Sequence, residues 1–343
     1  MNVGVVGCGY WGSKHVRVLQ GLSEVDQVAA IDPREEIRAS LQAAFPGLAA
    51  FPSLEAAAGS VDAVVLATPP ATHAELGLEA MDAGLHVLIE KPLATTPEDA
   101  RRLIEEAERR HLTLMVGHTF EYNPAVWQLR DLIRSGELGR VLYIDSARLN
   151  LGLYQSDVNV LWDLAPHDVS IMNFLLDAKP TVVDAWGSRH VHDSLEDVAY
   201  LRLEYSDLDV TTQIHVSWLD PAKVRRVTVV GDEKMAVYND LNQEERIRIY
   251  DKGVDPLPSE AGPDVPLGYR YGGITSPVVD FREPLQLEDQ HFVRSILDGR
   301  TPATDGESGL SVVETLFAAD HAMQSGRSVQ LDLAPTPAVS AAR

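Results

Sequence analysis

The sequence predicts an α/β protein with two domains: a doubly wound parallel sheet, followed by an α+β domain with an open antiparallel sheet. The length of 343 residues suits two domains. In residues 1–121 short apolar strands alternate with helices, which is the order that builds a parallel sheet. After residue 121, five strand-like segments follow one another without helices between them, and such strands pair antiparallel.

The first domain begins with a strand, a glycine-rich turn and a helix. Residues 3–6 are apolar, residues 7–12 (GCGYWG) fit G-x-G-x-x-G, and residues 13–22 have helical spacing. In dinucleotide-binding sheets these glycines permit a tight turn, close approach of a pyrophosphate, and packing of the helix on the strand. A glycine turn without a ligand is the alternative, since the motif alone is weak evidence. The predicted cofactor-binding residues of this loop are Gly7, Gly9, Tyr10, Trp11 and Gly12.

A carboxylate follows the second predicted strand, residues 25–31. Asp32 lies twenty residues beyond Gly12, a spacing typical of the group that binds an adenosine ribose. Asp32 could instead cap a helix or a turn, but the glycine loop favours the ribose role. An acid would repel a 2′-phosphate, so NAD is the first choice of cofactor. Arg34 could reach such a phosphate and keeps NADP open.

The alternation of strands and helices continues to residue 116. Gly84 is placed to end one helix, and Thr96 to cap the next. The predicted strands are residues 61–67, 86–89 and 112–116, and the predicted helices are residues 73–83 and 96–110. Ligands of such sheets bind at the carboxyl ends of the strands. The candidates there are Thr68, Pro69, His73, Glu90 and Lys91, although His73 could be a surface histidine and Lys91 a solvated loop charge.

The second domain, residues 122–333, has a different pattern. Its predicted helices are residues 124–134, 162–176, 288–297 and 306–324, and its predicted strands are residues 141–149, 182–190, 198–204, 210–218, 225–230 and 234–238. Residues 253–281 are rich in Pro and Gly and predict an extended loop that could cross to a neighbouring subunit. Residues 334–343 predict a flexible tail. The sheet must be covered, either by self-association or by its own helices.

Composition excludes several classes of function. A net charge of −22 disfavours nucleic acids and anionic membranes, and no apolar stretch approaches the roughly 20 residues of a membrane span. The single cysteine, Cys8, cannot form an intramolecular disulfide, and no secretory signal precedes the first strand. We therefore expect a cytoplasmic protein. No Cys/His set has zinc spacing, so no metal site is predicted.

One pair of residues has the spacing needed for acid–base chemistry. Asp163 and His167 are four apart in a predicted helix and therefore lie on one face. A carboxylate can orient an imidazole there, and the histidine pKa near neutrality suits proton transfer. A structural hydrogen bond, or Asp163 as a helix cap, would explain the same pair. His118 follows a strand end and could line the ligand crevice or be a buried histidine.

Together these residues resemble the Gfo/Idh/MocA family of NAD(P)-dependent oxidoreductases over nearly the whole chain. The resemblance rests on GCGYWG, TPPATH, EKP, the D-x-x-x-H of residues 163–167, and the stretch that begins EDQHFVRSILDG. It implies a Rossmann domain, an open-faced antiparallel sheet, and a homodimer or homotetramer assembled through that sheet. It also implies that the substrate is a sugar, a cyclitol or a nucleotide-linked sugar.

The resemblance implies roles by position. Lys91 would donate to the reacting oxygen, His167 would accept its proton, Asp163 would be the neighbour of His167, and the Lys91-Pro92 bond would be cis. The segment SARLNLGLYQSDVNVLWDLAPHDVSI looks most like members that act on nucleotide-activated sugars or aminosugars. The candidate substrate residues are His118, Tyr122, Asn150 and Trp162. The rival hypotheses are an inositol or free-sugar dehydrogenase, a non-catalytic dinucleotide-binding regulator, and a hydrolase with tightly held NAD.

Overall fold

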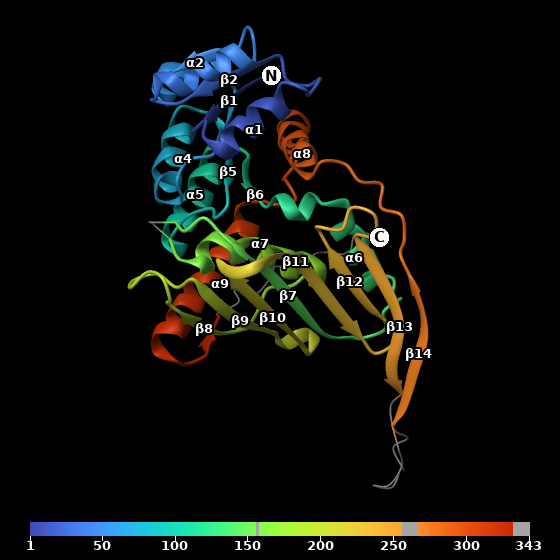
Figure 1. The fold of residues 1–343 in the computed structure, drawn as a ribbon. Helices are drawn as coiled ribbons and strands as arrows, with labels where there is room; N and C mark the ends of the chain where they lie inside the picture. Colours follow the sequence, from blue (N-terminus) through green and yellow to red (C-terminus); the bar gives the residue numbers. More distant parts are fainter. Residues whose placement is uncertain (156–157, 256–266, 332–343) are drawn as a thin grey trace. The chain divides into compact units, whose positions relative to one another are not determined.

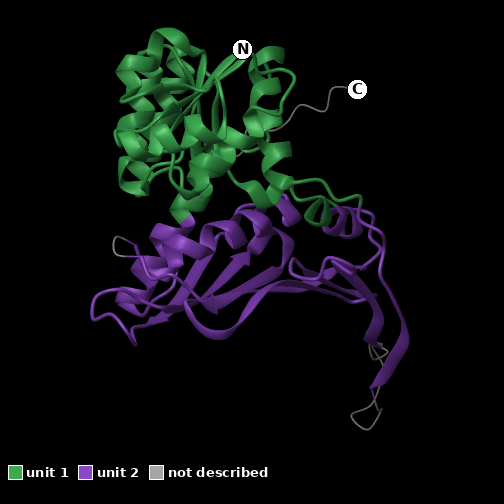
Figure 2. Cartoon of the chain, turned by 45° about the horizontal axis from the view of Figure 1, so that its top comes forward, with its two compact units in different colours: residues 1–127, 280–314 green, residues 128–279, 315–343 purple. Residues whose placement is uncertain are grey.

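The computed structural model describes residues 1–155, 158–255 and 267–331 (Figure 1). The chain folds as two compact units, coloured separately in Figure 2. Unit 1 comprises Met1–Trp127 and Asp280–Glu314, and unit 2 comprises Gln128–Val279 and the chain from Thr315 onward. A single boundary at residue 121 does not describe this division, because a late segment of the chain returns to unit 1. The expected tail, residues 334–343, lies outside the described residues.

Unit 1 is built on a parallel sheet. Its six strands within the described ranges lie in the order β3-β2-β1-β4-β5-β6, with every neighbouring pair parallel. Their bounds are β1 Asn2–Val6, β2 Gln27–Ile31, β3 Ala49–Phe51, β4 Ala63–Leu66, β5 His86–Glu90 and β6 Leu114–Gly117. This order reverses direction between β1 and β4, which is where such sheets bind their ligands. The predicted Rossmann sheet is confirmed.

Helices flank this sheet. They are α1 Tyr10–Leu19, α2 Glu35–Ala44, α3 Leu54–Ala57, α4 His73–Asp82, α5 Pro97–Arg110 and α8 Pro284–Asp298. Helix α8 contacts α1, and α4 contacts α5; Figure 1 shows these two pairs on opposite sides of the strands. Thr96 caps α5 as predicted, since its hydroxyl accepts a hydrogen bond from the Asp99 amide at 3.2 Å. The segment α2-β3-α3 was not predicted, because α2 buries only Leu41 and so lacks a clear apolar stripe.

Unit 2 is built on a larger sheet. The nine strands found in the described part of the chain have the order β14-β13-β12-β11-β7-β10-β9-β8-β15. Their bounds are β7 Val141–Leu151, β8 Val182–Ser188, β9 Val198–Tyr205, β10 Val210–Ser217, β11 Leu219–Gly231, β12 Met235–Asn239, β13 Ile247–Asp255, β14 Gly268–Thr275 and β15 Val329–Gln330. The sheet is antiparallel as predicted, with one exception: β7 and β10 pair parallel.

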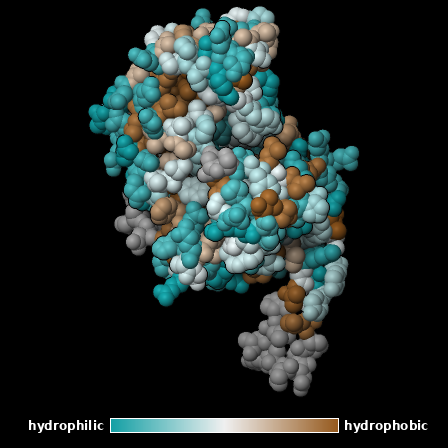
Figure 3. Space-filling view, turned by 60° about the vertical axis from the view of Figure 1, so that its left-hand side comes forward, coloured by the Kyte–Doolittle hydropathy of each residue, from teal (hydrophilic) through white to brown (hydrophobic). Residues whose placement is uncertain are grey.

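The extended loop predicted for residues 253–281 is wrong at residues 253–255 and 268–275, which are strand, while residues 256–266 lie outside the described residues. β14 pairs with β13 in antiparallel register, for example Val254 with Tyr269. The alternating tyrosines of β14 favour a strand, and this signal outweighs the local Gly content. Three apolar side chains near the ends of this strand pair are about half exposed, namely Val254, Leu267 and Ile274. Figure 3 shows brown surface on this hairpin, within a face that is mostly hydrophilic.

Two long helices accompany the sheet of unit 2. Helix α7, Val160–Leu176, contacts β7, β9 and β10, and its Val169, Ile171 and Met172 are buried. Helix α9, Gly306–Ser325, begins in unit 1 and continues into unit 2, and α6, Pro124–Arg134, also spans a unit boundary. None of the helices in the described ranges is both long enough and apolar enough to cross a membrane.

Candidate active site

The glycine loop has the geometry of a phosphate-binding turn. Gly7 has φ +81°, a value that L side chains rarely adopt, and a Cβ on Gly12 would lie 2.0 Å from the Gly7 carbonyl oxygen. A Cβ on Gly9 would meet no described atom within 4 Å, so open space faces this residue. Gly9 also precedes α1, whose first turn carries no acidic residue and no side-chain cap. The amides of that turn are therefore placed to bind an anion.

Two aromatic residues begin α1. Tyr10 is 74% exposed and Trp11 is 44% exposed, and their rings meet edge to face with centroids 5.5 Å apart. The ammonium nitrogen of Lys14 lies 4.6 Å from the Tyr10 ring centroid. A cation therefore lies beside the turn where an anion would bind, although Lys14 is not one of the predicted site residues.

Asp32 is buried under Arg34. Its carboxylate accepts a hydrogen bond from the Cys8 amide at 2.9 Å and a two-point contact from the Arg34 guanidinium at 2.8 and 2.9 Å. The hydrogen bonds from Arg34, together with those of the backbone, lower the pKa of Asp32 to about 2 despite burial. Asp32 thus fixes the glycine loop, and a ribose could reach the carboxylate only if Arg34, whose side chain is half exposed, moved aside.

His73 connects the ends of β4 and β5. One ring nitrogen lies 2.8 Å from the Pro92 carbonyl oxygen and the other lies 2.9 Å from that of Thr68. Burial lowers the pKa of His73, so the ring is neutral at pH 7 and donates to one carbonyl at a time. Because His73 is fully buried, it holds the Thr68-Pro69 turn in place rather than offering its ring to a cofactor.

Lys91 follows directly after β5, as predicted, and the Lys91-Pro92 peptide bond is cis. The Lys91 amide donates to the carboxylate of Glu90 at 3.1 Å. Glu90 is buried and faces His15 of α1, which in turn contacts Asp289 of α8. His15 and Asp289 are not among the site residues predicted from the sequence. The available signal was a polar residue on an otherwise apolar helix face, since His15 lies on the same side of α1 as Val16 and Leu19.

His118 is fully buried after β6, and neither of its ring nitrogens has a hydrogen-bond partner among the described residues. Burial lowers the pKa of His118 to about 4, so the imidazole is neutral at pH 7. Such a ring can donate and accept hydrogen bonds but is a poor base at neutral pH. Tyr122 differs from the expectation: its ring belongs to the core of unit 1 and its hydroxyl pairs with Thr304 at 3.1 Å, so it is a packing residue.

In unit 2, Asp163 and His167 lie on one face of α7, both half-buried. Asp163 is not the helix cap. That role belongs to Asn159, whose side chain accepts from the Trp162 amide at 3.2 Å. The Asp163 carboxylate instead accepts a hydrogen bond from the Trp218 indole at 2.9 Å. Trp162 is buried and its own indole donates to Asp320 of α9, so it also supports α7.

A buried ion pair anchors α7 to the sheet one residue after His167. Asp168 is paired with Arg148 of β7 at 2.5 Å and also accepts from the Ser146 hydroxyl at 2.7 Å. Arg148 lies beside Arg225 of β11 in the strand register. Arg225 donates to the Asn150 side chain at 2.6 Å, and burial together with the charge of Arg148 lowers its pKa to about 10. Arg225 therefore remains a cation at neutral pH.

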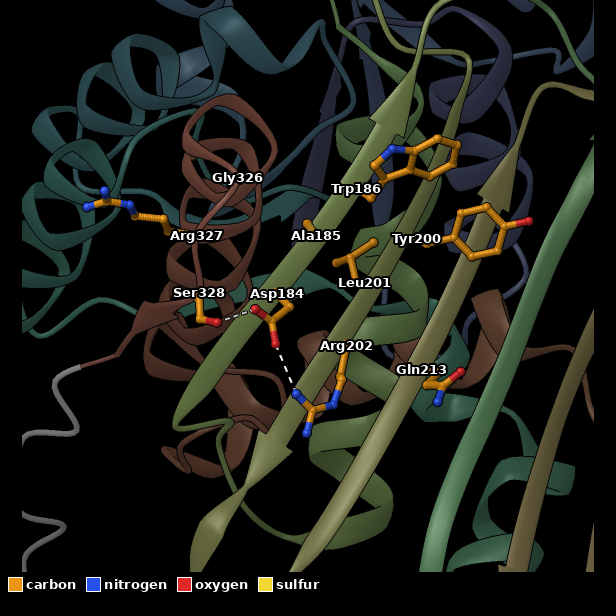
Figure 4. Close-up of a pocket in the computed structure, with 10 residues that line it drawn as sticks. All are labelled: Asp184, Ala185, Trp186, Tyr200, Leu201, Arg202, Gln213, Gly326, Arg327 and Ser328. Carbon is orange, nitrogen blue, oxygen red and sulfur yellow. Dashed lines mark hydrogen bonds and ion pairs between the residues drawn. The ribbon is translucent and has the colours of Figure 1, made fainter.

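A separate pocket lies on the sheet of unit 2. It has a volume of about 870 Å³ and is lined by β8, β9, β10 and residues 326–328. Figure 4 shows Trp186 and Tyr200 on neighbouring strands, with Asp184 between Ser328 and Arg202. None of the predicted site residues lines this pocket. No group of three or more His, Cys, Asp or Glu side chains suited to a metal ion occurs in the part of the chain that the structure describes.

Comparisons with known proteins place both parts of the chain in one family. The family model for oxidoreductases with an NAD-binding Rossmann fold matches residues 1–118, and that of the GFO/IDH/MocA C-terminal domain matches residues 126–237. UDP-N-acetylglucosamine 3-dehydrogenase of Acidithiobacillus ferrooxidans is 31% identical and covers 91% of this chain and 94% of that protein. Inositol 2-dehydrogenase 2 of Saccharopolyspora erythraea is 28% identical over 99% of this chain and 98% of that protein.

A solved structure extends the likeness to the fold. The crystal structure of GenD2 from gentamicin A biosynthesis, in complex with NAD, has a TM-score of 0.81 and 27% identity, with 97% of each chain covered. The two family models match consecutive parts of this sequence, and the relatives named here cover 91–99% of it. The chain therefore belongs to the Gfo/Idh/MocA family of oxidoreductases.

Proposed function

We propose that this protein transfers a hydride between a nicotinamide dinucleotide and a ring hydroxyl or ketone of a sugar that is nucleotide-linked or an aminosugar. Unit 1 binds the dinucleotide, and unit 2 contributes to substrate binding. The observation that carries the proposal is the position of Lys91: its backbone is held by Glu90 at the carboxyl end of β5, in the same sheet as the glycine loop. That edge is where sheets of this type bind ligands.

The residues of unit 1 fit NAD. The open space at Gly9 and the uncapped first turn of α1 suit a pyrophosphate, with Lys14 as a nearby cation. Asp32 and Arg34 are the pair that would meet the adenosine ribose or a 2′-phosphate. When bound, the nicotinamide ring takes up or supplies the hydride. Net charge elsewhere on the protein is negative, so these local donors must provide the attraction.

Three side chains are assigned to the chemistry. The Lys91 ammonium stabilises the negative charge that develops on the substrate oxygen, and His167 takes the hydroxyl proton during oxidation or returns it during reduction. Asp163 accepts from Trp218 and thereby keeps a fixed carboxylate one helical turn before His167. His118, being neutral, contributes a hydrogen bond to the ligand rather than proton transfer.

Arg225 supports the choice of a nucleotide-linked substrate. No carboxylate in the described ranges forms an ion pair with Arg225, although Asp163 and Asp168 act on it electrostatically. Its guanidinium contacts carbonyl oxygens and Asn150, a candidate substrate residue. A diphosphate would give this guanidinium a direct ion-pair partner, in addition to the longer-range attraction of Asp168, Asp240 and Asp163. The similarity to UDP-N-acetylglucosamine 3-dehydrogenase supports the same substrate class, whereas the similarity to inositol 2-dehydrogenase 2 favours a cyclitol.

The test is a substrate screen that follows the absorbance of reduced nicotinamide. UDP-N-acetylhexosamines, free aminosugars and inositols are offered with NAD and with NADP. We expect net reduction of NAD with a nucleotide sugar, and His167→Ala to lower kcat by about 10²–10⁴-fold with cofactor affinity retained. His321→Gln, an exposed histidine on α9, is the control. An unchanged rate in His167→Ala removes the assignment, and no net absorbance change with any substrate favours a regulator or a hydrolase.

We further propose that the sheet of unit 2 assembles copies of this chain into a homodimer or homotetramer. Its outer face carries Trp186, Tyr200 and His215, whose neighbouring rings lie 5.7 and 4.0 Å apart. Trp186 is 57% exposed and Tyr200 is 44% exposed, more than such rings usually are in a monomer. Sedimentation analysis of Tyr200→Asp should give a smaller species than the wild type, while Leu208→Asp in the turn after β9 should not. Equal masses for wild type and Tyr200→Asp would contradict this assignment.

A further inference from the structure

A group of buried charged side chains lies beneath the carboxyl end of β5. His15 of α1 is fully buried between two carboxylates: Nδ1 lies 2.8 Å from Oδ1 of Asp289, and Nε2 lies 3.1 Å from Oε1 of Glu90. Asp289 is also fully buried, and the Glu90 side chain is only 9% exposed. One imidazole therefore connects the helix of the glycine loop, the strand that precedes Lys91, and α8.

The Glu90 carboxylate uses its two oxygens differently. Oε1 faces His15, and Oε2 accepts the backbone amide of Lys91 at 3.1 Å. The neighbouring strand leaves space for this carboxylate, because a Cβ on Gly117 would lie 3.1 Å from both the Cα and the Oε2 of Glu90. The orientation of Glu90 therefore depends on His15 on one side and on the small residue at position 117 on the other.

The protonation states agree with an ion pair. Burial alone would lower the pKa of His15, but the charge and hydrogen bond of Asp289, with those of Glu90, raise it well above its usual value. Burial would raise the pKa of Glu90, but His15 and Lys91 lower it. Glu288 also faces this group; burial and the charge of Glu90 raise its pKa, and Thr119 donates to it at 2.8 Å. Burial raises the pKa of Asp289 as well, while His15 opposes that shift. The raised pKa of His15 favours the imidazolium, whose two ring N–H groups point to Asp289 and Glu90.

Stability alone does not explain such a group. Replacing a buried ion pair with well-packed apolar residues is often neutral or stabilising, whereas removing one partner is costly. The strand and helices that carry this group also supply Leu88 and Phe292 to a buried apolar core. An apolar side chain could fill the position of His15. Such a side chain could not hold the Glu90 carboxylate, which accepts the Lys91 amide.

We propose that His15, Glu90 and Asp289 form a positioning device for Lys91. His15 fixes the Glu90 carboxylate, and Glu90 fixes the backbone from which the Lys91 side chain extends toward the reacting oxygen. Because His15 is part of α1, its hydrogen bond to Glu90 also fixes the position of Lys91 relative to the helix that follows the glycine loop. This inference rests on the proposed role of Lys91. Misplacement by about 1 Å in such sites can lower rates about 10²-fold, which makes the device measurable.

The test is a double-mutant cycle of His15→Gln and Lys91→Met, measured with the substrate found in the screen. Glutamine fills much of the volume but cannot carry the charge or donate to both carboxylates. We expect His15→Gln to lower kcat at least about tenfold, with KM for cofactor and sugar within about threefold. In the Lys91→Met background the same substitution should change kcat by less than about twofold, because the group it positions is gone.

A second route avoids altering the charged residues. Gly117→Ala places a methyl group against Glu90 Oε2 and should also lower kcat in the wild-type background but not in Lys91→Met. It decides the question if His15→Gln does not fold. His86→Gln is the matched control: this histidine begins the same strand and accepts the Thr113 amide at 2.9 Å, far from the carboxylates. It should lower stability without changing kcat.

The outcomes of these experiments distinguish failure of the proposed function from failure of the positioning role alone. If Lys91→Met keeps the wild-type rate, the proposed function fails and the positioning role fails with it. If Lys91→Met is impaired, but His15→Gln and Gly117→Ala lower kcat equally in both backgrounds, only the positioning role is overturned, and the buried group is structural. A rise in the KM of the cofactor alone would overturn it as well, since His15 would then serve the glycine loop and not Lys91.

Discussion

His118 should make this protein less stable in mild acid. The imidazole is fully buried, and burial lowers its pKa from 6.5 to about 4. As the pH falls below 6.5 the unfolded chain binds a proton at this residue that the folded chain does not, so the free energy of unfolding decreases until about pH 4. A shift of this size corresponds to about 3 kcal/mol, at about 1.4 kcal/mol per pKa unit.

The perturbation is His118→Phe, which keeps an aromatic ring and removes the titration. Urea denaturation at fixed temperature gives the free energy of unfolding of both proteins between pH 7.5 and pH 4. Other ionisable groups also contribute to the pH dependence of stability, so the difference between the two proteins is the quantity to follow. We expect the variant to gain about 3 kcal/mol relative to the wild type as the pH falls through this range. His321→Gln provides a control with an exposed histidine. A difference that stays constant with pH would refute the reasoning.

Three further predictions concern the cofactor and the anchor of α7. Gly9→Ala should weaken NAD binding at least about tenfold in a fluorescence titration. Gly12→Ala, whose Cβ would press against the Gly7 carbonyl oxygen, should lower the stability of the protein more than Gly9→Ala does. Equal stability losses in the two variants would contradict this. Arg34→Ala should shift kcat/KM toward NAD over NADP by about tenfold or more, and an unchanged ratio would show that Arg34 does not meet a 2′-phosphate. Asp168→Asn should destabilise the protein by about 3–5 kcal/mol in urea titrations, because it breaks a buried ion pair; a loss below about 1 kcal/mol would show that the pair contributes little.

Local signals were sufficient for most of the fold. Helix α5 begins and ends where the Thr96-Pro97 start and the charged last turn predict, and α6 has the predicted bounds. Such elements are specified by caps and by a strong apolar stripe. The parallel pairing of β7 with β10 could not be predicted, because these strands are far apart in sequence and their order depends on contacts across the whole sheet.

The candidate site shows the same limit. Motif and spacing identified the glycine loop, Lys91 and the Asp163-His167 pair. They did not identify His15 or Asp289, because these residues are separated by 274 positions and gain meaning only when α8 packs on α1. Tyr122 and Trp162, two of the candidate substrate residues, are buried and serve packing instead. The signal in the sequence for this buried charged group was His15, a polar residue on the apolar face of α1.

Helix α8 is translated near the end of the chain, and this affects how unit 1 packs during synthesis. Phe292 and Val293 complete the core that Val3, Val16 and Leu19 begin, and Asp289 supplies a counter-charge for His15. A nascent chain that has left the ribosome only as far as residue 121 therefore exposes apolar surface on α1 beside a histidine that lacks one of its two carboxylates. The dinucleotide-binding half, although first in the sequence, reaches its final packing only after nearly all of the polypeptide has been translated.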